Sequence, residues 1–91
     1  MGAADRPLVT VRYWAAARAA AGRESDDVRA ATLGEALRAV LAKHEGNRRF
    51  ADVVGVCSVL VGSAPVSSQD PETVTVAPGD VVELLPPFAG G

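Results

Sequence analysis

The chain has little of what most catalytic and metal-binding sites are built from. Its 91 residues include one cysteine, one histidine and one tryptophan, and aromatic residues make up only 4% of the sequence. Without a second cysteine no internal disulfide can form, which is typical of cytoplasmic proteins. Cys57 and His44 alone do not make the ligand cluster that a metal site needs, so we expect no bound metal or other cofactor.

Charge of one sign and long apolar runs are also scarce. The chain has nine basic and eleven acidic residues, a net charge of −2, and only Arg48 and Arg49 among the basic residues are adjacent. A nucleic-acid-binding domain needs a basic patch, which this distribution excludes. No apolar run approaches the roughly 18 residues of a membrane-spanning helix, and residues 1–6 do not resemble a secretory signal. We therefore expect neither nucleic acid nor a membrane as a partner.

The residues that are present indicate a single small domain, 1–91, with a folded core. Hydrophobic residues make up 48% of the chain, which argues against disorder. Residues 8–14 alternate between apolar and polar, which predicts a strand with Val9, Val11 and Tyr13 on its core face. An alanine-rich helix should follow over 15–21 and end at Gly22, before a weak edge strand over 24–30.

The clearest helix signal lies near the middle of the chain. Thr32 and Glu35 fit a capping box, and Gly46 can end the helix, so the main helix is expected over 32–45. Its apolar face should consist of Leu33, Ala36, Leu37, Val40 and Leu41. A further helical turn over 47–54 should carry Phe50 and Val53 inward.

The second half of the chain alternates short apolar segments with turns. Pro78-Gly79 fits a type II turn, in which glycine supplies the positive φ. Strands are expected over 57–61 and 81–85, with shorter candidates at Val66 and 72–76. This order of elements, with one long helix, predicts an α+β fold in which a mixed sheet of about four to five strands packs on one main helix.

The last six residues, 86–91, differ from everything before them. Pro86 and Pro87 have a fixed φ and no N–H, so they end the preceding strand. Phe88 and Ala89 then lead to Gly90 and Gly91. Because glycine has no Cβ, a Gly-Gly end is the thinnest tail that a peptide can form, and it can enter a tunnel that other residues would block. The sequence therefore predicts a protruding tail that presents the α-carboxylate of Gly91 to another protein.

Three segments together resemble the ubiquitin-like β-grasp sulfur carriers of the MoaD/ThiS family: 11–15 with Gly22, 32–37, and 78–91. The tail Pro86-Pro87-Phe88-Ala89-Gly90-Gly91 is the specific element, and the resemblance covers nearly the whole chain. The chain length, the extra segment 47–54 and the double proline make it most similar to the small subunits of molybdopterin synthase. The thiamine-pathway carriers of the family are generally shorter.

The resemblance implies that the chemistry takes place at Gly91, with Gly90 giving access to it. A separate adenylyltransferase of the ubiquitin-activating type would use ATP and Mg²⁺ to form an acyl-adenylate on Gly91. A sulfur donor enzyme would then displace AMP and leave a thiocarboxylate. The large catalytic subunit of molybdopterin synthase would use this sulfur on the pyranopterin precursor. The chain itself would be a non-catalytic subunit.

Strand alternation also predicts a docking surface. It places Trp14 on the face of the sheet away from the main helix, and it points Leu60 and Leu85 outward as well. If their three strands are neighbours, these side chains form an apolar patch beside the tail that partner enzymes could bind. Ordinary packing under a loop is the competing interpretation. In the tail, Phe88 is a second candidate anchor, and Pro87 and Ala89 are also expected to contact partners.

Other interpretations stay open from the sequence. The chain could carry sulfur for thiamine, cysteine or a specialised metabolite, or it could be a ubiquitin-like modifier that Gly91 joins to lysines. It could also be a β-grasp binding module whose tail has no role. Cys57 fits a small buried hydrophobe, His44 fits a helix-terminal position beside the helix dipole, and Asp80 and Glu83 fit solvated charges at strand edges.

Overall fold

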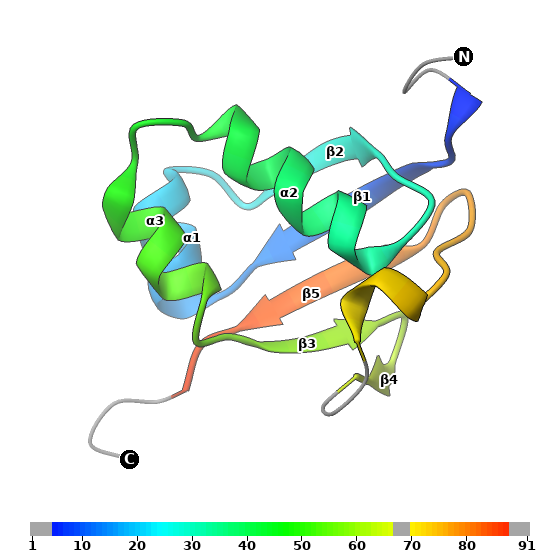
Figure 1. Ribbon diagram of the computed structural model, residues 1–91. Coiled ribbons are helices and arrows are strands. Elements are labelled where there is room, and N and C mark those ends of the chain that lie inside the picture. The colour runs from blue at the N-terminus through cyan, green and yellow to red at the C-terminus, as the bar shows by residue number, and fades with distance from the viewer. Residues whose placement is uncertain (1–4, 67–69, 88–91) are drawn as a thin grey trace.

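The computed structural model describes residues 5–66 and 70–87. Five strands form one mixed sheet in the order β2-β1-β5-β3-β4. The strands are β1 Leu8–Tyr13, β2 Ser25–Arg29, β3 Ser58–Val61, β4 Ala64–Pro65 and β5 Val81–Leu85. The helices are α1 Ala15–Ala21, α2 Leu33–Lys43 and α3 Arg48–Val54. The main helix α2 lies across one face of the sheet, and α1 and α3 lie side by side at the end where β1 and β5 finish (Figure 1). The α+β architecture is the one that the sequence predicts.

The middle of the sheet is formed by strands from the two ends of the chain. β1 runs antiparallel to β2 and parallel to β5, and β5 runs antiparallel to β3. The predicted alternation in β1 is confirmed, because Val9, Val11 and Tyr13 are all buried. β2 is an edge strand, as expected, and its inward positions are Val28 and the carboxylate Asp26. None of the described helices covers the face opposite α2 (Figure 1).

The main helix begins with a variant of the predicted capping box. Thr32 Oγ1 accepts a hydrogen bond from the Glu35 backbone N–H at 3.1 Å. The Glu35 carboxylate reaches back one residue further than expected and accepts from the N–H of Ala31, at 2.7 Å, instead of that of Thr32. α2 ends at Lys43, and Gly46 adopts a positive φ of 87° in the turn that follows. The carboxylate of Glu35, in the first turn, also interacts favourably with the helix dipole.

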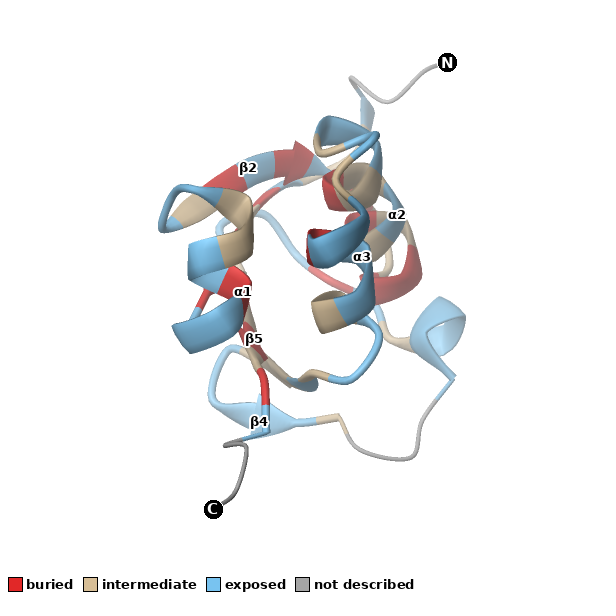
Figure 2. Cartoon of the chain, turned by 90° about the vertical axis from the view of Figure 1, so that its left-hand side faces the viewer, coloured by how far each residue is buried: buried red, intermediate tan, exposed pale blue. Residues whose placement is uncertain are grey.

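The core lies between the sheet and the inner sides of the three helices, where the buried residues of Figure 2 gather. Phe50 is fully buried and brings α3 onto the core, which confirms the inward placement predicted for it. The other large, fully buried side chains are Leu33, Leu84, Val9, Val11, Val40 and Val82. This core fixes the positions of β1, β5 and β3, from which the candidate site is built.

The strand candidate over 72–76 is wrong. Pro71–Thr73 forms a short 3-10 helix, and Asp70 caps it by accepting a hydrogen bond from the Glu72 N–H at 3.0 Å. Proline at a first helical position loses no hydrogen bond, which favours this turn over a strand. In that stretch only Thr75 makes a β-bridge, with Thr32. The short fourth strand is Ala64–Pro65, and Val66, proposed as a strand residue, comes immediately after it.

Candidate partner-docking site

The tail predicted from the sequence is attached to the central strand of the sheet. β5 is hydrogen-bonded to β1 on one side and to β3 on the other. The strand ends at Leu85, as the two prolines predict; Pro86 is buried and Pro87 is exposed. The backbone N–H of Trp14 donates a hydrogen bond to the backbone carbonyl of Leu84 at 3.2 Å, so the last residues of β5 are held from the β1 side as well. The end of β5, from which the chain continues into the tail, is therefore hydrogen-bonded on both sides.

Most of the tail positions for which the sequence predicts a reactive or anchoring role lie outside the described residues. This applies to Phe88, Ala89, Gly90 and Gly91, and their predicted roles stay predictions. Pro87 is described and is exposed, which leaves it accessible to a partner. Its contact with a partner also stays a prediction.

The structure brings Trp14, Leu60 and Leu85 onto one face of the sheet, and we call these three residues the outer patch. Their strands are neighbours, which was the condition for the patch. Leu60 and Leu85 are diagonal neighbours across the β3–β5 pair, in which Leu60 faces Glu83 and Ser58 faces Leu85. Trp14 is 37% exposed, and the two leucines are half-buried. The patch adjoins the root of the tail, and its binding role stays a prediction.

Two charged side chains contact the ring of Trp14. The indole Nε1–H donates to Glu83 Oε1 at 2.9 Å, and the Arg12 guanidinium carbon lies 5.1 Å from the ring centroid. Glu83 is therefore more than the solvated edge charge that the sequence indicated. The sequence contains a sign of these contacts, because strand alternation places Arg12, Trp14 and Glu83 on the same face of the sheet.

A cavity of about 250 Å³ lies at the edge of the sheet next to the outer patch. It is lined by Cys57, Ser58, Val59, Leu60, Pro65 and Val66. Burial raises the pKa of the Cys57 thiol, so the thiol stays protonated at neutral pH and is a poor nucleophile. This agrees with a packing role for Cys57, although its side chain is only half-buried.

The histidine has a buried partner that sequence reasoning missed. His44 Nε2 lies 2.8 Å from Asp26 Oδ2, and both side chains are less than a tenth exposed. Asp26 also accepts from the Tyr13 hydroxyl at 2.7 Å and from Arg23 Nη1 at 2.9 Å. Burial favours the neutral acid, but the hydrogen bonds from His44 and Tyr13 and the charge of Arg23 outweigh it and lower the pKa of Asp26. The His44 ring also packs on Phe50, with centroids 4.3 Å apart. This cluster fastens β2, β1 and the end of α2 together.

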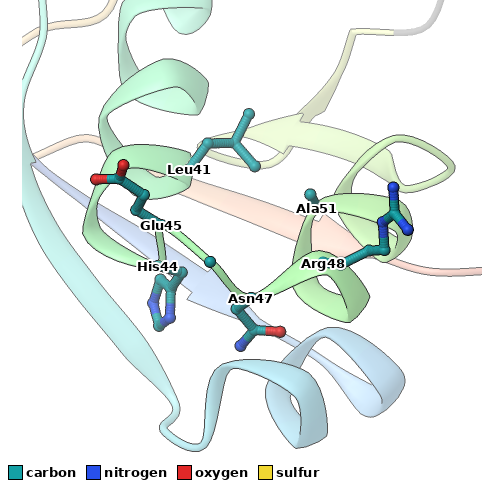
Figure 3. A pocket seen from close by; sticks show the side chains of 7 residues that line it. Leu41, His44, Glu45, Asn47, Arg48 and Ala51 are labelled. Atoms are coloured by element: carbon teal, nitrogen blue, oxygen red, sulfur yellow. The ribbon is translucent and has the colours of Figure 1, made fainter.

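A second hollow, of about 280 Å³, lies on the helix side between the end of α2 and α3 (Figure 3). It is lined by Leu41, His44, Glu45, Gly46, Asn47, Arg48 and Ala51. None of the predicted partner-binding residues that the structure describes lines it. Among residues 5–66 and 70–87, no group of three or more histidine, cysteine or acidic residues is placed to hold a metal ion. No described helix combines the length and apolar character needed to cross a membrane.

Comparison with known structures supports the fold. The chain is 28% identical to a protein from a Helicobacter pylori complex of subunits 1 and 2 of molybdopterin-converting factor, with a TM-score of 0.66, 92% of this chain and 99% of that chain covered. Small archaeal modifier protein 1 from Methanosarcina acetivorans is 18% identical, with a TM-score of 0.77 and 93% and 97% coverage. The same modifier from Haloferax volcanii is 22% identical, with a TM-score of 0.72 and 90% and 99% coverage. These neighbours share the ubiquitin-like β-grasp fold.

No curated protein matches the chain. The sequence profile of the ThiS family matches residues 11–91, a span that includes the second half of β1, the outer patch, β5 and both C-terminal glycines. The segments that carry the resemblance in the sequence, and the three residues of the outer patch, all fall within this match. The chain therefore belongs to the ThiS family.

Proposed function

We propose that this chain is a sulfur carrier for molybdopterin synthesis and that Gly91 bears the transferred sulfur. The observation that carries the proposal is the ThiS-family match through Gly91, on a fold whose central strand leads directly into the tail. The buried Pro86 and the paired strand β5 support it, because a rigid root lets a thin tail be aimed into a partner. The outer patch beside that root would supply the docking surface.

The chemistry would need only the carboxylate of this chain. A carboxylate oxygen is a poor leaving group, so a partner adenylyltransferase would first join it to AMP from ATP, with loss of pyrophosphate. Hydrosulfide released by a donor enzyme would then form a C–S bond at Gly91 while the C–O bond to AMP breaks, so that AMP leaves and the proton of the hydrosulfide passes to water. The resulting thiocarboxylate is a nucleophile on a tail with no Cβ at its last two positions. Side chains of the chain would bind and orient partners, and none would take part in the bond changes.

The choice of molybdopterin over other acceptors rests on the Helicobacter pylori neighbour. That protein occurs with a second subunit of molybdopterin-converting factor, and the two chains align over nearly their full lengths. By transfer, the partner that receives the sulfur would be a large synthase subunit. The activating enzyme would be a second partner of the same tail, and the setting would be the reducing cytoplasm that a single cysteine favours.

The test is the intact mass of the chain after incubation with the host's adenylyltransferase, ATP, Mg²⁺ and a sulfur source. A gain equal to the exchange of one oxygen for one sulfur is expected. Cleavage after Glu83, the last acidic residue, should place that gain in the peptide 84–91. Gly91→Ala should block the gain, whereas Ala89→Gly, which keeps the tail thin, should not. An unchanged mass with the active cognate enzyme would refute the proposal.

A ubiquitin-like modifier is the second candidate, and the fold likeness to the archaeal modifier proteins is the observation that favours it. Lys43 is the one lysine of the chain, so conjugation between copies through a lysine side chain could use no other residue. Covalent conjugates of the chain that form in a cell lysate, persist on denaturing gels and are absent for the Gly91→Ala variant would support a modifier. Sulfur uptake without conjugates would support the carrier alone.

A further inference from the structure

Trp14 is held on the outer face of the sheet by two charged side chains, Glu83 and Arg12. We infer that Glu83 and Arg12 are positioning residues that fix the ring of Trp14 for docking, and that the adenylyltransferase, as the partner, presents an acidic group to Arg12. This inference rests on the proposed function, because it concerns the surface that the partners would bind. To the proposed function it adds the orientation of the Trp14 ring and the charge of the partner surface that contacts it.

The contacts define the orientation of the ring from its edge and from its face. The indole N–H is directed at Glu83 Oε1, at 2.9 Å. The guanidinium of Arg12 lies 5.1 Å from the ring centroid, within the range of a cation–π contact. Arg12 and Glu83 face each other in the register of the parallel pair β1–β5. Two adjacent strands therefore fix the ring between them.

The backbone at this corner turns sharply and is strained. Ala15, directly after Trp14, has a positive φ of 49°, a conformation that costs a residue with a Cβ free energy. It lets β1 turn into α1 within one residue, while Trp14 keeps its extended conformation and its backbone bond to Leu84. The sharp turn leaves the ring at the end of the strand, beside Leu85, where a partner can reach it.

Fixing the ring in advance favours binding. A tryptophan that is 37% exposed at a strand end would otherwise lose rotational freedom when a partner covers it. Immobilising one side chain on binding lowers the affinity about two- to twelvefold. If Glu83 and Arg12 have already restricted the ring, the partner does not bear this cost.

The charge of Arg12 defines what the partner must offer. Within the described residues, Arg12 has no hydrogen bond or ion pair with a carboxylate, and the nearby Glu83 carboxylate accepts from the indole. A partner that covers Trp14 also removes water from the guanidinium beside it. Burying an unpaired charge is costly, so a matching surface needs an acceptor at that point. An apolar pocket with a carboxylate on its rim fits this arrangement.

The experiment measures binding of the whole chain to the host's adenylyltransferase by calorimetry at several salt concentrations. Glu83→Ala should weaken binding about two- to twelvefold, and Glu83→Gln, which keeps an acceptor oxygen, should restore most of it. Arg12→Gln should weaken binding at least about tenfold and flatten its salt dependence. Arg49→Gln makes the same charge change on exposed α3 and should leave affinity unchanged.

A second readout follows the ring itself. Trp14 is the one tryptophan of the chain, so its fluorescence reports this site alone in the free protein. Acrylamide quenching should increase in Glu83→Ala, and circular dichroism should show that the fold is retained. If Trp14→Ala weakens binding but the Glu83 and Arg12 variants bind and quench like the wild type, the inference is wrong while the docking surface stands. If Trp14→Ala also binds normally, the surface and the inference both fail, whereas sulfur uptake at Gly91 is judged separately by mass.

Discussion

Removing the carboxylate of Asp26 should destabilise the protein more than any surface change. The side chain is 4% exposed and accepts hydrogen bonds from His44, Tyr13 and Arg23 at 2.7–2.9 Å. In Asp26→Ala, the Tyr13 hydroxyl and the His44 ring lose their partner inside the protein. Removing one member of a buried, hydrogen-bonded pair costs about 3–5 kcal/mol. A domain of this size has roughly 5–14 kcal/mol in total, so the loss is a large share of its stability.

Urea unfolding, followed by the fluorescence of Trp14, measures this loss. A cost of about 3 kcal/mol should lower the urea midpoint by roughly 1–3 M and the Tm by roughly 12–24 °C. Asp27→Ala is the matched control. Its neighbouring carboxylate is exposed and accepts one hydrogen bond, from Thr10 Oγ1 at 2.8 Å, so its removal should cost no more than about 1 kcal/mol.

The pH dependence gives an independent check of the same reasoning. The pKa of Asp26 is lowered in the folded state, so its contribution to stability is present above its unfolded pKa, about 4. The contribution is lost as the pH falls through the lower, folded pKa. The difference in unfolding free energy between wild type and Asp26→Asn should therefore shrink in acid. Equal stability of the Asp26→Ala and Asp27→Ala proteins at pH 7 would show that the buried cluster does not hold the strands together.

Three further outcomes are expected. Burial, with the hydrogen bond to Asp26 adding to it, raises the pKa of Tyr13, so stability should be lost as the pH rises above about 10. In urea titrations, the Tyr13→Phe protein should lose less stability over that alkaline range. Gly34→Ala would place a Cβ against the Glu72 carboxylate, but that end of Glu72 is flexible and half-exposed, so the free energy of unfolding, measured by thermal unfolding, should change by no more than about 1 kcal/mol; a loss of about 3 kcal/mol would contradict this. Ala15→Gly relieves a positive φ and should stabilise the protein by up to about 1 kcal/mol; a lower Tm would show that the corner is not strained.

The periodic parts of the fold were predictable from the sequence. The alternation of β1, the capping residue Thr32 and the turn at Gly79 each depend on neighbours within a few positions, and each appears as expected, with Gly79 at a φ of 83°. The error over 72–76 has the same local origin. The β-rich composition of this stretch favours a strand, but Pro71 fits the first position of a helical turn, and the turn forms instead.

The candidate site was predictable only in part, for a different reason. Parity alone placed Trp14, Leu60 and Leu85 outward, but their assembly needed the strand order, which depends on pairing between residues far apart in the sequence. The pairing of His44 with Asp26 joins positions that are 18 residues apart in different elements. An inward-facing carboxylate at the edge strand β2 was the one local sign that such a partner must exist.

The central position of β5 has a consequence for how the protein is made. β5 is the last element of the described chain, yet it is the strand that joins β1 to β3. During synthesis, β1 and β3 cannot pair with the central strand until Val81–Leu85 have been added. Strand pairing between residues far apart in the sequence forms late in folding. A chain cut short before β5 would lose both the middle of its sheet and the tail that follows. Residues 86–91 are therefore added to the growing chain only after the strand that completes the sheet.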